Sequence, residues 1–417
     1  MHISNINSNT NFSATKIYQI KHENSVCSIK ETDLCAFFDL NGKNIYIKDG
    51  DNYVCLPENK ENLKKLLCDE KHSIVLHDVK TLQVHMYSMG LCEISAKFFD
   101  LMLASYVCDP SSVVTRERLL AGSVLSGKQE EDEQVFCSVL DFMCTLHEEF
   151  CKRISQNNQE NLLYNIEFPL SLVLADMEHE GFLIDKTALE NYGAELDRRI
   201  FEITQEIYSF SEGDFNINSP KQLGEVLFER LGLPAPKKTK TGYSTDAETL
   251  EKLRFEHPII DLILEYRSLA KLKSTYADGL LKALADDGRL HTNFKQALTL
   301  TGRLSSAEPN LQNIPIRTPE GRKIREVFIA KQGNVLVDAD YSQIELRLMA
   351  VMANDKAMID TYLDGRDIHT MTASQVFGVA LDKVTPDMRK KAVQAKPRTP
   401  LKVRDIRMTL CKYAVFS

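Results

Sequence analysis

The sequence predicts an α/β domain over residues 1–155, followed by an α+β domain over residues 156–417. In the first part, short β-branched and aromatic runs alternate with helical patterns, as in α/β folds. In the second part, long helical patterns come first, and a polar, turn-rich segment and a strand-to-helix transition follow them. At 417 residues, the chain is long enough for two or three domains that each bury their own core.

The composition is that of an ordinary soluble protein, with 43% hydrophobic and 26% charged residues. The net charge of −8 argues against a surface that is basic throughout, but it is compatible with a local basic groove. The ten cysteines form no C-x-x-C pairs and have no histidines at zinc-site spacing, so we expect reduced thiols in a cytosolic chain. Because no membrane-spanning run or hydrophobic signal core is present, we expect a cytoplasmic protein without a membrane partner.

The first part shows alternating strand and helix signals. Metal-dependent nucleases need clustered carboxylates, but the acidic residues here follow no such arrangement, so we interpret this part as a scaffold. Strands are predicted at residues 35–41, 44–47 and 73–77, with a hairpin signal at Asn41-Gly42, and helices are predicted at residues 98–107 and 135–150.

Helical patterns open the second part. Residues 170–179 have apolar residues at helical spacing, and Gly181 is a C-cap signal directly after them. Further helices are predicted at residues 186–210, 220–231 and 257–284. The connecting segment 237–244 contains Lys237, Lys238 and Lys240 and no acidic residue. It is either a solvated loop or a flexible basic loop that lies along nucleic-acid phosphates.

Residues 290–315 are dense in hydrogen-bonding side chains and have little apolar periodicity. An irregular loop of turn-forming residues would explain this composition. A surface that donates to many acceptors would also explain it, and the DNA minor groove presents purine N3 and pyrimidine O2 acceptors at every base pair. The side chains concerned are Gln296, Thr299, Thr301, Arg303, Ser305, Asn310, Gln312 and Asn313.

Residues 335–350 predict a buried strand followed by a helix. The apolar run 335–337 is typical of a strand, and Asp338 and Asp340 follow at its end. From Ser342, the expected N-cap, apolar residues at 344, 348 and 351 form a helical stripe. A carboxylate between a strand and a helix can face a metal, although a lone Asp-x-Asp is more often an ordinary turn.

Several segments together resemble the family A DNA polymerases. They are TGRLSS at 301–306, PNLQNIP at 309–315 and DYSQIELR at 340–347, with FNINSPKQLG, KKTKTGYST and RSLAKLKSTY resembling the thumb of these enzymes. Residues 367–369 resemble the start of their fingers, and the match spans about residues 161–392.

The resemblance implies an α/β exonuclease-like domain at residues 1–155 and an α+β polymerase domain at 156–417. The polymerase domain would have a helical thumb (about 186–285), an antiparallel-sheet palm (about 161–185 and 290–350) and the start of the fingers (about 351–392). Such a protein is a DNA-directed DNA polymerase, a nucleotidyltransferase that adds deoxynucleotides to a primer 3′ end in DNA replication and repair. Its partners would be primer–template DNA and deoxynucleoside triphosphates, its cofactor a pair of Mg²⁺ ions, and we expect a monomer.

The resemblance also implies roles for individual residues. Asp340 matches the carboxylate that binds both metal ions, and the backbone carbonyl of Tyr341 would join it. Glu345 matches the residue that crowds a ribose 2′-hydroxyl, although an ion pair with a neighbouring arginine is the alternative for this residue alone. The other implied contacts are to DNA by Arg303, Asn310, Gln312, Asn313, Lys237, Lys238 and Lys240, and to the nucleotide by His369 and Arg389.

The sequence departs from the family pattern in the nuclease motifs and in the fingers. Leu82 stands where one nuclease motif has a metal-binding aspartate, and a second motif ends in Leu140 instead of an aspartate. We therefore expect a vestigial 3′–5′ exonuclease-like domain, without the 5′ nuclease domain that usually precedes it. Val393 stands where the fingers helix has a lysine, and residues 393–417 form a divergent, proline-bearing tail.

The later His-Asp-Glu motif is also missing, which suggests a frameshift, a truncated gene or a genuinely short variant. With half of the two-metal site, such a chain is expected to have no appreciable polymerase activity. The alternative is a non-catalytic, sequence-independent DNA-binding fragment. A third interpretation, an active nuclease, is disfavoured by Leu82 and Leu140.

Overall fold

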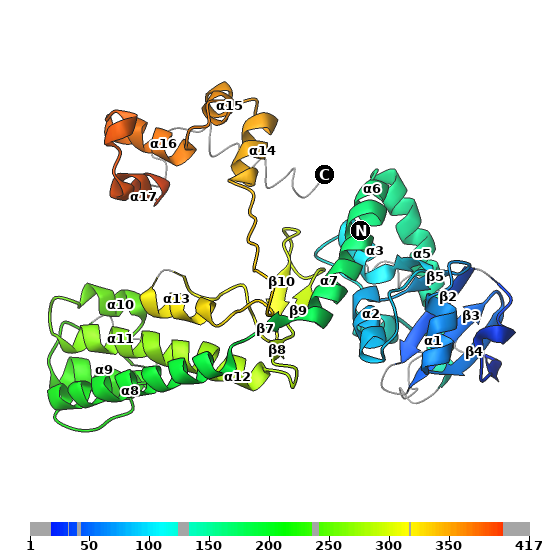
Figure 1. Ribbon diagram of the computed structural model, residues 1–417, viewed down its shortest axis with the longest axis horizontal. Helices are drawn as coiled ribbons and strands as arrows, with labels where there is room; N and C mark the ends of the chain where they lie inside the picture. The colour runs from blue at the N-terminus through cyan, green and yellow to red at the C-terminus, as the bar shows by residue number, and fades with distance from the viewer. Residues whose placement is uncertain are drawn as a thin grey trace. The chain divides into compact units, whose positions relative to one another are not determined.

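The computed structural model describes residues 18–31, 33–39, 43–123, 133–235, 242–316 and 318–394. By its internal contacts the chain divides into two compact units, Met1–Asn334 and Val335–Ser417 (Figure 1), and each has its own architecture. Three predicted features lie outside the described residues: the Asn41-Gly42 turn, the group Lys237, Lys238 and Lys240, and the tail beyond Gln394. Within the described ranges, no helix is both long and apolar enough to cross a membrane.

The first unit begins with a six-stranded mixed sheet of order β1-β4-β3-β2-β5-β6. β2, β3 and β4 pair antiparallel, whereas β1 is parallel to β4, and β5 and β6 continue parallel from β2. This sheet confirms the strands predicted near 35–41, 44–47 and 73–77. The strands are β1 (Ile20–His22), β2 (Asp33–Asp39), β3 (Asn44–Asp49), β4 (Asn52–Pro57), β5 (Ser73–Leu76) and β6 (Lys97–Asp100).

Helices cover both faces of this sheet. Successive side chains of a strand point to opposite faces, so each strand contributes to the cores on both sides. On β3, Ile45 and Ile47 pack into one core with side chains of α1 and α2, whereas Tyr46 packs into a second core with α5. The helices are η2 (Val26–Ser28), α1 (Lys60–Leu67), α2 (Val79–Ser88), α3 (Leu101–Cys108), α4 (Arg116–Ser123) and α5 (Glu133–Gln156). The helix predicted at 135–150 is confirmed within α5.

The helix predicted at residues 98–107 is wrong in its first turn, because residues 98–100 belong to β6 and α3 begins at Leu101. The Asp100 carboxylate accepts hydrogen bonds from the backbone nitrogens of Met102 (2.8 Å) and Leu103 (3.3 Å). Asp100 is therefore the N-cap, and the residues before it remain extended. The sequence is ambiguous here because short apolar runs fit a strand and a helix equally well.

A long helical connection leads from the sheet to the rest of the first unit, through α6 (Glu160–Leu162), η3 (Leu163–Glu167) and α7 (Phe168–Glu180). The predicted helix 170–179 and its glycine cap are both confirmed. Gly181 has a φ of +62°. A Cβ atom on it would lie 2.8 Å from Nδ1 of His291 and 2.9 Å from the Leu290 carbonyl oxygen, so this position needs glycine.

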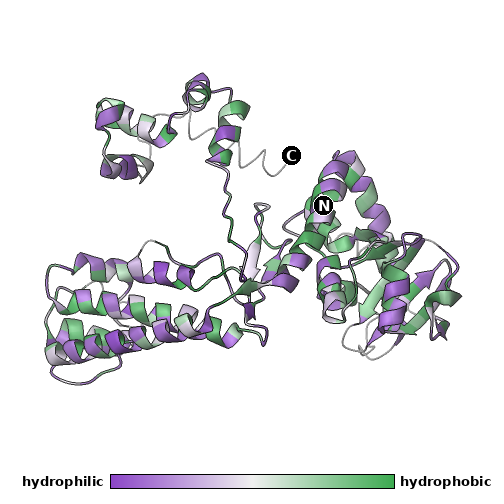
Figure 2. Ribbon diagram, in the orientation of Figure 1, coloured by the Kyte–Doolittle hydropathy of each residue, from purple (hydrophilic) through white to green (hydrophobic). Residues whose placement is uncertain are grey.

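The remainder of the first unit is mainly helical and packs around one core. Hydrophilic and hydrophobic segments alternate along α8 and α11 (Figure 2), as expected for helices with one buried face. The helices predicted at 186–210, 220–231 and 257–284 are confirmed, with π-helical turns inside the last two. The helices are α8 (Lys186–Ser211), α9 (Pro220–Gly224), η4 (Glu225–Arg230), α10 (Ala247–Lys252), α11 (Ile259–Lys271), η5 (Leu272–Ala277), α12 (Asp278–Ala283) and α13 (Pro319–Glu326).

Two short antiparallel pairs complete the first unit: β7 (Phe182–Leu183) with β8 (Arg289–Leu290), and β9 (Asn293–Lys295) with β10 (Ser305–Ala307). An isolated antiparallel β-bridge pairs Ile184, just before α8, with Phe328, just after α13. The polar segment 290–315 is therefore partly β-structure rather than an entirely irregular loop.

The regular elements of the second unit are all helices in its described residues: α14 (Ile344–Met352), α15 (Lys356–Leu363), α16 (Ile368–Phe377), η6 (Leu381–Lys383) and α17 (Pro386–Gln394). The buried strand predicted at 335–337 is wrong, because these residues are 79%, 56% and 84% exposed and belong to no strand. An apolar run becomes a strand only when a neighbour pairs with its backbone. The Ser342 cap is also wrong, since Gln343 is the N-cap residue, at φ +53°.

Candidate functional site

Buried hydroxyl groups join separate parts of the polar segment 290–315 by hydrogen bonds. The hydroxyl oxygens of Thr292 and Ser306 lie 2.6 Å apart, and both residues are at most 5% exposed. The Thr292 hydroxyl also donates to the carbonyl of Pro309 at 2.8 Å. Gln296 points inward as well, and its Nε2 donates to the side chain and the backbone of Glu167, at 2.6 and 2.9 Å. Part of the polar array that the sequence shows is therefore used inside the protein.

The expected DNA contacts Arg303, Asn310, Gln312 and Asn313 lie at the surface of the same segment, where all four are exposed. The Gln312 amide nitrogen donates to the carbonyl of Leu304 (3.0 Å), and the Gln312 amide oxygen accepts from the backbone nitrogen of Ser306 (3.3 Å). Asn310 Oδ1 accepts from the backbone nitrogen of Gln312 at 3.0 Å. These bonds fix the backbone that carries the four exposed side chains.

Both neighbouring parts of the first unit hold this segment in place. The Tyr276 hydroxyl of η5 donates to the carbonyl of Asn313, and the Tyr106 hydroxyl of α3 donates to the carbonyl of Thr299 at 2.7 Å. Glu178 of α7 accepts from the backbone nitrogen of Phe294 at 2.6 Å. The α/β part therefore supports the polar segment directly, which is consistent with its interpretation as a scaffold.

In the second unit, Asp367 connects three helices. Its carboxylate accepts two bonds from the Arg389 guanidinium of α17, at 2.7 and 3.3 Å, and one from Nε2 of Gln343 at the start of α14, at 3.0 Å. It also caps α16, because Oδ2 accepts from the backbone nitrogen (3.0 Å) and the hydroxyl (2.7 Å) of Thr370. The Arg389 guanidinium is the main cause that holds the pKa of Asp367 well below its ordinary value.

The motif residues of the second unit do not meet in one place. Asp340 and Tyr341 lie in an exposed, non-helical segment, and Glu345 is exposed in the first turn of α14. His369 is half-buried near the start of α16. Arg389, expected to contact a nucleotide, donates from Nε and Nη2 to Asp367, and its side chain remains 45% exposed.

The oxygen atoms of Asp340 and of the Tyr341 carbonyl are suitable in type for Mg²⁺, which prefers hard oxygen ligands. Within the described ranges, the groups of three metal-ligating side chains do not include Asp340. A pair of ions needs carboxylates on more than one side. Asp340 and Tyr341 could thus supply oxygen ligands, and the described residues bring no cluster of three metal-ligating side chains to them.

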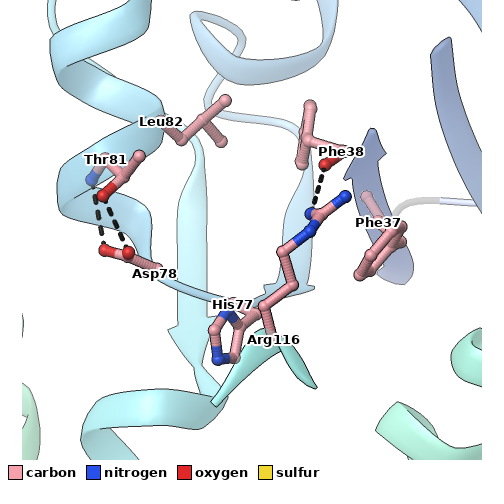
Figure 3. Close-up of a pocket in the computed structure, with 8 residues that line it drawn as sticks. Phe37, Phe38, His77, Asp78, Thr81, Leu82 and Arg116 are labelled. Carbon is pink, nitrogen blue, oxygen red and sulfur yellow. Dashed lines mark hydrogen bonds between the residues drawn. The ribbon is translucent and has the colours of Figure 1, made fainter. Parts of the chain in front are cut away.

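A cavity of about 230 Å³ lies in the α/β part, where β2, α2 and α4 meet (Figure 3). Its one acidic lining residue, Asp78, caps its own helix by accepting from the backbone nitrogen (3.2 Å) and the hydroxyl (2.7 Å) of Thr81. Arg116 donates to the carbonyl of Phe38 at 3.0 Å. Leu82, which the sequence resemblance places at a nuclease aspartate position, is 3% exposed in the core. Such a lining does not provide the clustered carboxylates of a two-metal nuclease.

Comparison with known proteins identifies the class of the chain. The sequence model for "DNA polymerase family A" matches residues 186–396, about half of the chain, so this protein belongs to DNA polymerase family A. The chain is 41% identical over 377 residues to DNA polymerase I of Caldicellulosiruptor bescii, a match that covers 89% of this chain and 44% of the relative. It is 43% identical over 346 residues to DNA polymerase I of Geobacillus stearothermophilus, covering 78% of this chain and 39% of that one.

A solved structure is also similar: the POL domain of Pol1 from M. smegmatis, in complex with DNA primer-template and dNTP. The TM-score is 0.73 at 35% sequence identity, and the match covers 84% of this chain and 63% of that one. The chain thus spans less than half the length of the two sequence relatives. The mixed α/β architecture with its parallel strands agrees with this similarity.

Sequence analysis missed the structural roles of two polar centres. Asp367 belongs to a matched motif, and its capping function could have been found from the Asp-x-x-Thr pattern before an apolar run. The ion pair between Lys80 and Glu178 (2.6 Å) joins residues 98 positions apart, and no local pattern indicates it.

Proposed function

We propose that this chain carries the primer–template-binding part and the first catalytic motif of a DNA-directed DNA polymerase. The observation that carries the proposal is the exposed set Arg303, Asn310, Gln312 and Asn313 on a backbone that is fixed by its own hydrogen bonds. The similar POL domain from M. smegmatis was solved with DNA primer-template and dNTP, and this supports the same partners here. The reaction would be templated addition of deoxynucleotides in DNA replication and repair.

The chemistry of this surface suits a sequence-independent contact. Guanidinium and amide groups donate hydrogen bonds, and every base pair presents acceptors in the minor groove. Because the backbone is fixed before binding, little backbone conformational entropy is lost when these side chains meet DNA. Lys237, Lys238 and Lys240 would add phosphate contacts that depend on salt but not on sequence.

In the second unit we assign Asp340 and the Tyr341 carbonyl to Mg²⁺ binding, Glu345 to exclusion of a ribose 2′-hydroxyl, and His369 and Arg389 to the incoming nucleotide. A bound pair of Mg²⁺ ions would activate the primer 3′-hydroxyl and stabilise the leaving pyrophosphate. Since the described residues supply one half of the ligands, we expect no appreciable primer extension by this chain alone. We further propose a cytoplasmic monomer.

The domain assignment belongs to the same proposal. Residues 1–155 would form a vestigial exonuclease-like scaffold, and residues 156–417 a partial polymerase domain with thumb (about 186–285), palm (about 161–185 and 290–350) and the start of the fingers (about 351–392). The tail 393–417 would diverge from the family. The buried positions of Leu82 and Leu140 support a scaffold role for the first part.

The second candidate is a non-catalytic DNA-binding fragment. Internal hydrogen bonds fix the polar segment, whereas Asp340 lies in an exposed segment without regular structure. This difference favours the second candidate. The two candidates share their DNA contacts and differ in the role of Asp340, which binds Mg²⁺ in the first candidate and has no chemical role in the second.

We expect Arg303→Ala to weaken binding of a fluorescent primer–template duplex about tenfold, the effect of losing one charge-assisted hydrogen bond. Fluorescence anisotropy of the purified chain at low salt measures this. Arg118→Ala, an exposed arginine on α4, is the matched control and should bind as the parent does. Absence of binding by the parent at low salt would contradict the proposed interface.

Primer extension with Mg²⁺ and all four deoxynucleotides tests the catalytic part, with DNA polymerase I of Geobacillus stearothermophilus as the positive control. No product is expected from this chain. A Mg²⁺-dependent product that Asp340→Ala abolishes would show that the chain completes its metal site, and the binding-fragment candidate would then be wrong.

A further inference from the structure

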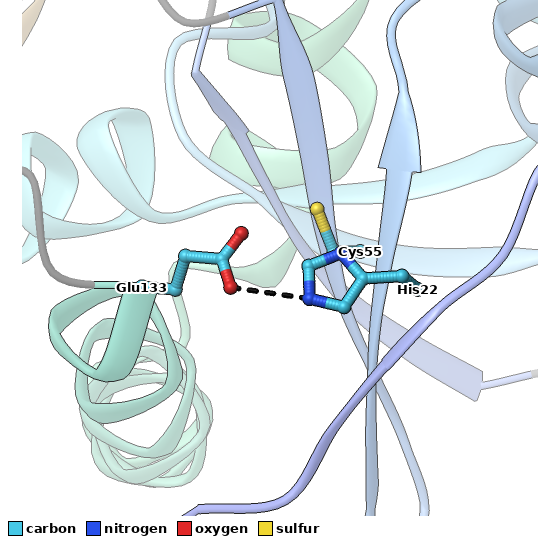
Figure 4. Close-up of side chains that lie close together, drawn as sticks. All are labelled: His22, Cys55 and Glu133. Atoms are coloured by element: carbon cyan, nitrogen blue, oxygen red, sulfur yellow. Dashed lines mark ion pairs between the residues drawn. The ribbon is translucent and has the colours of Figure 1, made fainter.

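Three side chains with metal-ligating atoms meet at the edge of the N-terminal sheet (Figure 4). They are His22 on β1, Cys55 on β4 and Glu133 at the start of α5, and their ligand atoms all lie within 4.8 Å of one another. His22 Nε2 is 3.2 Å from Glu133 Oε2. None of the three lines the cavity at α2 or belongs to the polymerase motifs.

The fold itself creates this meeting point. β1 and β4 are parallel neighbours, and His22 and Cys55 are direct partners in their register, so both side chains emerge on the same face of the sheet. The start of α5 is pinned beside them, because the Gln134 amide exchanges two hydrogen bonds with the backbone of Tyr18, at 2.8 and 3.0 Å. The three ligands thus come from three elements whose backbones are already in place.

We propose that His22, Cys55 and Glu133 bind one divalent transition-metal ion, Zn²⁺, with a water molecule as the fourth ligand. Cysteine, histidine and glutamate are all zinc ligands, and the 3.2 Å separation of Nε2 and Oε2 is close to the about 3.3 Å edge of a tetrahedral site with bonds near 2.0 Å. The thiolate and the carboxylate together neutralise the charge of the ion.

The three side chains differ in burial and therefore in their freedom to move. Cys55 is 5% exposed and fixed in the sheet, whereas the His22 and Glu133 side chains are 62% and 40% exposed and can rotate toward the ion. Their exposure also provides the entry path and room for the water ligand. On binding, the Cys55 thiol releases its proton to solvent and the sulfur takes the metal instead. A bound ion would tie the short edge strand β1 to α5.

Sequence spacing does not indicate this site, because the ligands are separated by 33 and 78 positions (55 − 22 and 133 − 55) and follow none of the usual zinc patterns. The competing explanation is a plain His22–Glu133 ion pair above an unrelated thiol. The thiols of Cys68 and Cys92, with sulfur atoms 3.3 Å apart, form another place where a thiol-binding metal could bind. The experiment must therefore separate these cases.

The test is titration of the metal-free full chain with Co²⁺ and Zn²⁺. We expect a thiolate-to-cobalt charge-transfer band that saturates at one equivalent and disappears when Zn²⁺ displaces the cobalt. His22→Ala should weaken Zn²⁺ binding at least tenfold, and Glu133→Gln should act in the same direction. Because His22 is exposed, its variant should fold like the parent. Cys55→Ser should remove the charge-transfer band.

Cys92→Ser is the matched control and should leave stoichiometry and affinity unchanged. A second measurement is thermal unfolding, in which saturating Zn²⁺ should raise the midpoint of the parent but not that of His22→Ala. The proposal is overturned if cobalt gives no thiolate band, if His22→Ala binds zinc like the parent, or if Cys92→Ser abolishes binding.

Discussion

Lys80→Ala is expected to destabilise the first unit by about 3–5 kcal/mol, because it leaves a buried carboxylate without its partner. The Lys80 ammonium lies 2.6 Å from Glu178 Oε1, and the two side chains are 6% and 8% exposed. Lys80 also donates to Asn293 Oδ1 at 3.3 Å. Its removal therefore affects α2, α7 and β9 at the same time.

Urea unfolding of the full chain, followed by circular dichroism, measures this effect. Lys65→Ala is the matched control, because the Lys65–Glu61 pair has a similar 2.7 Å separation but its side chains are 41% and 72% exposed. Such a surface pair is worth about 0–1 kcal/mol. Equal loss of stability in the two variants would show that the burial of the Lys80–Glu178 pair has no energetic consequence.

The same ion pair has a consequence for function. Glu178 also accepts from the backbone nitrogen of Phe294, at the start of the polar segment that carries Arg303. Loss of Lys80 should therefore weaken the proposed DNA binding even though Lys80 is buried. Lys80→Met with Glu178→Gln removes both charges and should recover part of the stability, because an unpaired buried charge costs more than a missing pair.

Much of the fold could be predicted from the sequence, because its helices and its sheet have strong local signals. Helical periodicity located α5, α7, α8 and α11, and glycine chemistry located the end of α7 at Gly181. The strand prediction failed at 335–337, because pairing depends on a neighbouring strand that local sequence does not specify. The boundary at Asp100 failed because apolar runs on both sides of the cap look alike.

In the candidate site, too, some features could be predicted from the sequence and others could not. Arg303, Gln312 and Asn313 could be named from motifs, and the structure places them at the surface. The internal bonds of Gln312 could not be predicted, because they depend on the turn that brings residues 304 and 306 back to it. Nor could the capture of Arg389 by Asp367, 22 positions away, be predicted from their spacing. Long-range polar pairs of this kind follow from the tertiary fold.

Asp367→Ala is expected to destabilise the packing of α16 and α17 by about 2 kcal/mol. The α16 N-cap contributes about 1 kcal/mol, and the Arg389 pair contributes at most about 1 kcal/mol because the arginine side chain is 45% exposed. Hydrogen exchange of the full chain, resolved by peptide, should show about 30-fold faster exchange in these helices. Asp387→Ala, which removes an exposed pair with Lys391 on α17, should change exchange little.

The pH dependence of hydrogen exchange, compared between the unmodified chain and a second variant, Asp367→Asn, tests the role of the Asp367 charge. Because the folded-state pKa of Asp367 is lowered below its ordinary value of 3.8, its charge stabilises the folded state above that value. The stability is lost as the pH falls below 3.8, where the unfolded chain takes up the proton first. Asp367→Asn cannot titrate, so its exchange should differ from the parent at neutral pH and converge toward it as the pH falls below about 3. A difference that stayed constant over this range would show that the Asp367 charge, and with it the Arg389 pair, does not hold these helices together.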